Sequence, residues 1–187
     1  MEELATALID LRAPEASKRL AASRVIERAA RMASTEATKV ALGRRTVTAA
    51  LVEAFGDTEA EVVRNAVVAI SEISRRYLKD DRAYPAVVRL LGSSDRVTRL
   101  WAANAAVVLR EGASLGDVSP LVRDRSAKVR AEVVRLGIGL AMHSDVPEAT
   151  RTVLRAMSAV AAEDRDRQVR EFAANLARVL ADPVGPA

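Results

Sequence analysis

The sequence predicts an all-α protein built as an array of about five helix pairs. Apolar residues recur at spacings i, i+3 and i+4, and the strict alternation that is typical of strands is scarce. Turn-forming residues interrupt this pattern repeatedly, and the segments that follow alternate interruptions resemble one another. Since a pair of amphipathic helices cannot bury both apolar stripes alone, we expect the pairs to stack and share one continuous core.

The interruptions divide the chain into about ten helical segments, because Gly and Pro end helices and Ser or Asp caps their first turns. In chain order the predicted helices are 2–12, 15–32, 36–55, 58–78, 82–92, 95–111, 114–122, 126–141, 146–162 and 166–181. The separators, in the same order, are Ala13-Pro14, Ser34-Thr35, Gly56-Asp57, Lys79-Asp80-Asp81, Gly92-Ser93-Ser94-Asp95, Gly112, Arg123-Asp124, Ser144-Asp145 and Glu163-Asp164.

We therefore expect a single repeat domain over residues 1–181. Its pairs are predicted at about 1–33, 34–79, 80–112, 113–143 and 144–181. Residues 182–187, with two prolines and a glycine, cannot continue a helix and are predicted to form a flexible C-terminal tail.

The second helix of each predicted pair carries a recurring segment with an arginine near its start. Val63-Arg64-Asn65-Ala66, Val129-Arg130-Ala131-Glu132 and Val169-Arg170-Glu171-Phe172 align with one another, and an acidic residue precedes each. The aligned arginines are at positions 19, 64, 99, 130 and 170, so their spacings are 45, 35, 31 and 40 residues. Such spacings are in the range of two-helix solenoid repeats.

The spacing of Asp124 from Val129-Arg130, repeated at Asp164 and Val169-Arg170, resembles the second helix of a HEAT repeat. The interval from Asp57 to Arg64 is one residue longer, and that from Asp95 to Arg99 is two shorter, with Thr98 in place of the Val. The resemblance implies a right-handed α-solenoid of about five HEAT-like helix pairs, in which these arginines bridge loop aspartates. Families with this fold are mostly binding scaffolds, although a few are enzymes. The alternatives are an irregular helical bundle and an armadillo array, whose usual third short helix has little room in these segments.

The composition excludes several kinds of catalytic and metal site. With no Cys and one His among 187 residues, the chain has no thiolate ligand, no His cluster and no Cys nucleophile. Its five aromatic residues offer few platforms for stacking bases or cofactors. We find no catalytic constellation, and we predict a protein that is not an enzyme, with no cofactor and no metal.

The net charge of +4 comes from one part of the chain. Residues 61–110 hold nine Lys and Arg against five Asp and Glu, whereas the flanking regions are balanced. A basic stretch can attract anionic partners, and Arg64, Arg96 and Arg99 are its candidate anion-binding residues. The alternative is that these are ordinary solvated or bridging arginines. Nucleic-acid binding, through phosphates or in the manner of a DNA glycosylase, is therefore the second functional hypothesis.

A stripe of mixed residues on the second helices is the candidate partner-binding surface. The position two after the repeat arginine holds a mixture of Ala, Glu and large aromatic residues, and a closed core would not accept the Glu. The position five after the arginine is polar in the third, fourth and fifth pairs and Ala69 in the second pair. The predicted stripe contains Trp101, Asn104, Glu132, Arg135, Phe172 and Asn175. It would face the concave side of the array, where Trp and Arg are common binding hot spots. The alternative is that Trp101 and Phe172 fill wider gaps between repeats.

These observations together favour a non-catalytic interaction scaffold or adaptor that binds a protein partner. The N-terminus is acidic, no apolar segment follows it as in a secretory signal, and no apolar stretch reaches the roughly 20 residues of a membrane span. We therefore expect a cytoplasmic protein without a membrane partner.

Overall fold

The computed structural model describes residues 2–143 and 145–181, and the predicted tail at 182–187 lies outside the described residues. Helices account for most of the described chain, and no strand occurs among these residues. None of the described helices has the length and apolar character needed to cross a bilayer. The chain divides into two compact units, Met1–Leu109 and Arg110–Ala187, so the single domain expected from the sequence remains a prediction.

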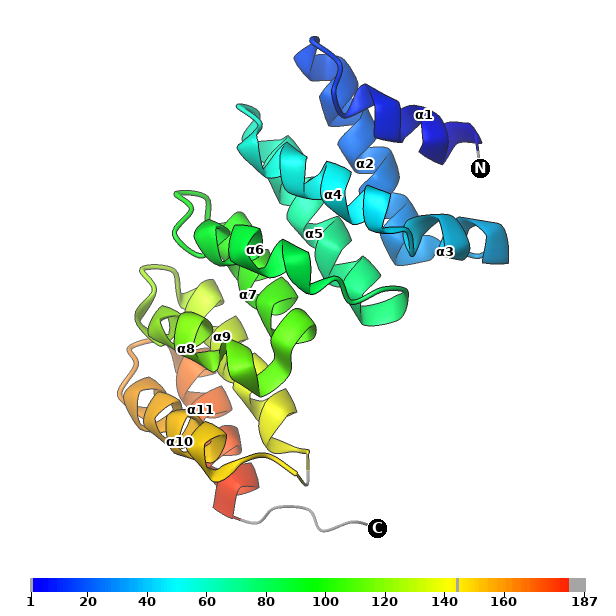
Figure 1. The fold of residues 1–187 in the computed structure, drawn as a ribbon. Coiled ribbons are helices and arrows are strands. Elements are labelled where there is room, and N and C mark those ends of the chain that lie inside the picture. The colour runs from blue at the N-terminus through cyan, green and yellow to red at the C-terminus, as the bar shows by residue number, and fades with distance from the viewer. Residues whose placement is uncertain (1, 144, 182–187) are drawn as a thin grey trace. The chain divides into compact units, whose positions relative to one another are not determined.

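Unit 1 contains three successive groups of helices (Figure 1). The first is α1 (Glu2–Asp10) with α2 (Ala16–Met32), and the second is α3 (Glu36–Leu42), α4 (Arg45–Glu53), the 3-10 turn η1 (Ala54–Gly56) and α5 (Ala60–Arg76). The third is η2 (Asp81–Ala83), α6 (Tyr84–Leu90) and α7 (Arg96–Arg110), which reaches the unit boundary.

Unit 2 contains two such groups. The first is η3 (Glu111–Ser114), α8 (Leu115–Val118), η4 (Ser119–Arg123) and α9 (Ala127–Ala141). The second is α10 (Glu148–Ala162) with α11 (Arg167–Ala181). In both units the last helix of each group, namely α2, α5, α7, α9 and α11, is the one that carries the repeat arginine, and we call these the second helices.

Aliphatic side chains at helical spacing form the core of each unit. In unit 1 Ile26, Leu51 and Ile70 are at most 1% exposed, and in unit 2 Leu154 and Leu176 are fully buried. In α5 every residue from 66 to 74 is buried, so this helix is enclosed on all sides. The alanines within this stretch are small enough to let neighbouring helices approach closely.

Two predicted helices are broken in the structure. The segment 36–55 is not one helix, because α3 ends before Gly43 and Arg44 adopts an extended conformation before α4. The segment 114–122 consists of α8 between two 3-10 turns, where Gly116 and Pro120 weaken a regular helix. The short α3 shows that our argument against an armadillo-like third helix was wrong for the second group.

Candidate functional site on the second helices

In unit 1 the repeat arginines join successive groups through loop aspartates. The Arg19 guanidinium donates to both carboxylate oxygens of Asp57, at 2.6 and 3.1 Å, and to the carbonyl oxygens of residues 13–14 in its own loop. Arg64 Nε donates to Asp95 Oδ2 at 3.2 Å. A repeat arginine of one group therefore binds the loop acid of the next.

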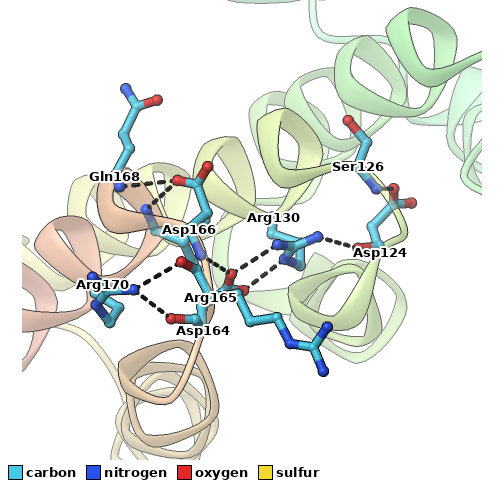
Figure 2. Close-up of polar contacts among 9 residues, drawn as sticks. Asp124, Ser126, Arg130, Asp164, Arg165, Asp166, Gln168 and Arg170 are labelled. Atoms are coloured by element: carbon cyan, nitrogen blue, oxygen red, sulfur yellow. Dashed lines mark hydrogen bonds and ion pairs between the residues drawn. The ribbon is translucent and has the colours of Figure 1, made fainter.

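Unit 2 repeats this arrangement with shorter hydrogen bonds between arginine and aspartate (Figure 2). Arg130 donates to the two carboxylate oxygens of Asp164 at 2.6 and 2.7 Å and to the carbonyl oxygen of Asp124 at 2.8 Å. Asp164 Oδ1 also accepts the backbone N–H of Asp166, so the same carboxylate caps the turn before α11. Two-point contacts of this kind fix orientation as well as distance. The bridging role that the HEAT resemblance implied is therefore observed for Arg19, Arg64 and Arg130.

The bridging aspartates ionise more readily than ordinary aspartates. The hydrogen bonds from Arg19 lower the pKa of Asp57, and those from Arg130 lower the pKa of Asp164. Burial raises the pKa of Asp95, but hydrogen bonds from Thr98 and Arg64 outweigh it, so this pKa is lowered as well. The folded chain therefore favours three ionised carboxylates at its inter-group contacts.

These lowered pKa values predict acid sensitivity. An unfolded aspartate has a pKa of about 3.9, so the stabilisation by each pair is complete above about pH 5 and is lost as pH falls through the lower folded-state pKa. We expect the stability advantage of the natural chain over Asp57→Asn to shrink between about pH 5 and pH 2.5, as measured by urea unfolding. A difference that stays constant over this range would contradict a linked proton at Asp57.

The structure places the three candidate anion-binding residues differently. Arg64 pairs with Asp95, and Arg99 is 4% exposed and donates to the carbonyl oxygens of Ser93 and Ser94. Arg96 is exposed at the first position of α7. Of these three residues, Arg96 is exposed to solvent, whereas Arg64 and Arg99 form contacts within the protein.

In unit 1 the predicted partner-binding stripe consists of Trp101 and Asn104. Trp101 is partly exposed, and the Arg31 guanidinium carbon lies 5.2 Å from the centre of its ring, which is cation–π geometry. Glu27 forms an ion pair with the same arginine. Asn104 is 3% exposed and donates to the carbonyl oxygen of Leu100 at 3.1 Å, so Trp101 and Arg31 are the accessible members of this cluster.

Arg31 was not among the residues predicted from the sequence. The signal was present, because Arg31 and Arg76 both follow a repeat arginine by 12 residues, at 19 and 64. The two residues meet in the structure, where Arg76 Nη1 donates to the carbonyl oxygen of Arg31. Alignment of the pairs could have identified this position, but not its contact with Trp101.

In unit 2 the stripe consists of two polar contacts and one aromatic residue. On α9 Arg135 forms two hydrogen bonds with Glu132, and their side chains are 50% and 18% exposed. On α11 Asn175 accepts a hydrogen bond from Arg178, and Phe172 is partly exposed nearby in the sequence. These side chains offer donors, acceptors and apolar area to a partner. Among the described residues no acidic, His or Cys cluster could hold a metal ion.

No protein-family profile and no curated protein sequence matches the chain. Solved structures do match. An engineered protein has a TM-score of 0.71 at 18% identity, covering 97% of this chain and 80% of its own. A designed armadillo repeat protein in complex with the peptide (KR)4 has a TM-score of 0.71 at 18% identity, covering 93% and 80%.

A third similar structure is one of the computationally designed armadillo repeat proteins for modular peptide recognition. It has a TM-score of 0.67 at 18% identity and covers 92% of this chain and 80% of its own. At these identities the comparison shows the fold alone. The chain therefore has the fold of an all-helical repeat solenoid, as the sequence predicts.

Proposed function

We propose that this protein is a non-catalytic scaffold that binds a protein partner on the exposed side of its second helices. The contact between Arg31 and Trp101 carries the proposal, because it presents a large aromatic ring and a cation together on the surface of unit 1. Trp and Arg dominate binding hot spots, since each contributes a large area together with directional polar contacts. The designed solenoids of similar fold include proteins made for peptide recognition, which supports a peptide or protein ligand.

Each unit carries its own set of candidate partner-binding residues. In unit 1 a partner would contact the accessible parts of Trp101 and Arg31, while the buried Asn104 supports the helix that carries Trp101. In unit 2 it would contact Arg135 and Phe172, with Glu132 and Asn175 holding neighbouring arginines in place. The two polar pairs of unit 2 are pre-organised, so binding orders few additional rotamers.

A protein partner agrees better with the contacts than nucleic acid does. Two of the three candidate arginines in the basic segment are occupied by Asp95 and by loop carbonyl oxygens, so they are not available to neutralise phosphates. We also propose, from the sequence, that the chain is a HEAT-like array and that it acts as an adaptor in the cytoplasm.

Trp101 supplies its own test, because it is the only tryptophan in the chain. We expect affinity capture with the natural chain, compared quantitatively with Trp101→Ala/Arg135→Ala, to reveal proteins that the double variant loses. Arg44→Ala/Arg123→Ala is the matched control, since both residues are exposed and lie outside the stripe. Titration of a captured protein should then change Trp101 fluorescence, and Trp101→Phe/Arg135→Ala should weaken binding at least tenfold, about 1.4 kcal/mol.

Two results would contradict this proposal. One is that the stripe variant and the control variant retain the same proteins in the same amounts. The other is that a captured protein binds without changing Trp101 fluorescence and with an affinity that the stripe substitutions leave unaltered.

A further inference from the structure

Among the described residues the last repeat arginine, Arg170, lacks the contact with a following aspartate that Arg19, Arg64 and Arg130 make. Like Arg130, it donates from Nη1 to its own loop, at 2.8 Å to the carbonyl oxygen of Asp164 and 2.9 Å to that of Arg165 (Figure 2). Arg19 and Arg130 use Nε and Nη2 to bind the aspartate of the following group. Among the described residues the same two nitrogens of Arg170 have no acceptor, and the residue is exposed.

The residues four and seven positions after the repeat arginine also differ between α11 and earlier second helices. In three earlier second helices the residues four and seven after the repeat arginine are buried, and one of them, Gly137, lies against Leu154 and Leu176 of the next group. The buried residues are Ser23 and Ile26 in α2, Val68 and Ser71 in α5, and Val134 and Gly137 in α9. In α11 the corresponding residues, Ala174 and Ala177, are exposed. The outer side of α11 therefore has the composition of a stacking surface, and no group within residues 2–143 and 145–181 is stacked on it.

A groove follows these residues between α10 and α11. It has a volume of about 710 Å³ and is lined mainly by alanines, including Ala159, Ala174 and Ala177, with Arg170 and Arg155 on its walls. Arg155 is held by Glu148 on its own helix. The groove is therefore apolar along its floor and basic at its edge, and we call it the α10/α11 face.

The first helix pair carries a complementary surface. Glu15 lies four residues before Arg19, as Asp95 lies four residues before Arg99, and Asp95 is the acceptor for Arg64. Glu15 is exposed, and its Oε2 is 3.5 Å from Nζ of the exposed Lys18. Because exposed ion pairs contribute little free energy, replacing Lys18 by another cation as the partner of Glu15 costs little. The side of α1 and α2 next to it has a groove of about 540 Å³, lined by Ala21, Ala22 and Val25 with acidic residues at its rim, namely Glu2, Glu3 and Asp10. We call this groove, together with Glu15, the α1/α2 face.

We propose that a second copy of this chain docks its α1/α2 face onto the α10/α11 face, with its Glu15 as the acceptor for Arg170. The contact continues the internal series Arg19–Asp57, Arg64–Asp95 and Arg130–Asp164 between molecules. Basic and acidic rims oppose each other, and the two alanine-lined grooves exclude water between them. Because the two faces differ, the association is head to tail, and it propagates into rings or open chains.

Charge-reversing substitutions test the proposal, and sedimentation velocity of the whole chain measures the association. Concentrations from about 10 µM to about 1 mM cover the range of weak association. We expect the natural chain to form species above the monomer as concentration rises. Arg170→Glu alone and Glu15→Arg alone should each weaken association at least tenfold, because like charges then meet. An equimolar mixture of the two variants should associate again, since each face then finds an opposite charge.

Arg165→Glu is the matched control, because it makes the same charge change on an exposed residue of the same loop. It should associate as the natural chain does, and circular dichroism should show equal helix content in all variants. A natural chain that stays monomeric throughout would overturn the proposal. So would association that Arg170→Glu abolishes but Glu15→Arg leaves unchanged, which indicates a symmetric contact between two α10/α11 faces.

Discussion

Replacing Leu154 by alanine is expected to lower the free energy of unfolding of unit 2 by about 2–5 kcal/mol, because it leaves a cavity in a closely packed core. Leu154 is fully buried in α10 and meets α9 where Gly137 leaves room for it. A Cβ built on Gly137 would lie 3.2 Å from Leu154 Cδ2 and 3.4 Å from Leu176 Cδ2, so the glycine and the two leucines fit one another closely.

Urea unfolding of the whole chain measures this loss, and amide hydrogen exchange in α9 and α11 assigns it to unit 2. Met142→Ala is the matched control, since it removes a comparable apolar side chain that is 61% exposed. The control should change stability by less than about 0.5 kcal/mol. A loss of less than about 1 kcal/mol for Leu154→Ala would show that this side chain is not closely packed between α9 and α11.

Asp164→Ala is expected to lower the stability of unit 2 by about 2–4 kcal/mol, because it leaves the largely buried Arg130 guanidinium without its charged acceptor. The two side chains, Arg130 and Asp164, are 17% and 9% exposed, so little water is available to replace the lost contacts. The substitution also removes the acceptor for the backbone N–H of Asp166, which weakens the turn that begins α11.

A double-mutant cycle isolates the interaction energy between Arg130 and Asp164 from the contacts that each makes with other residues. If Arg130 and Asp164 interact directly, Arg130→Ala/Asp164→Ala should cost at least about 1 kcal/mol less than the sum of the single changes. Glu163→Ala, at an exposed neighbouring position, should be nearly neutral. Additive losses in the cycle would mean that the pair seen in Figure 2 contributes little to stability.

Much of the architecture could be predicted from the sequence, because it depends on short intervals along the chain. Apolar periodicity defined the long helices α2, α5, α7, α9, α10 and α11 to within about two residues. The interval between loop acid and repeat arginine resembled that of a HEAT repeat, and this resemblance implied the bridges between arginines and aspartates. The break at Gly43 escaped prediction, since one glycine within a periodic segment does not decide between a kink and a continuous helix.

The candidate site was only partly predictable for a different physical reason. Trp101 and Phe172 were chosen because their aligned positions vary in chemistry, and both are partly exposed. Asn104 was chosen on the same kind of pattern but is buried, because helix packing around α7 encloses it. The contact of Trp101 with Arg31 joins residues 70 positions apart, and no local pattern specifies such a meeting.

The sequence by itself determined an all-helical repeat protein with a recurring arginine and a loop acid in each pair. Helix periodicity, capping and the stacking of amphipathic pairs depend on neighbouring residues and therefore leave a repeated pattern. Only the tertiary structure decided which of these arginines bind an aspartate of the following pair. Arg130 is enclosed by the following pair while Arg170 is exposed, although their local sequences are alike, because burial depends on what packs against a surface.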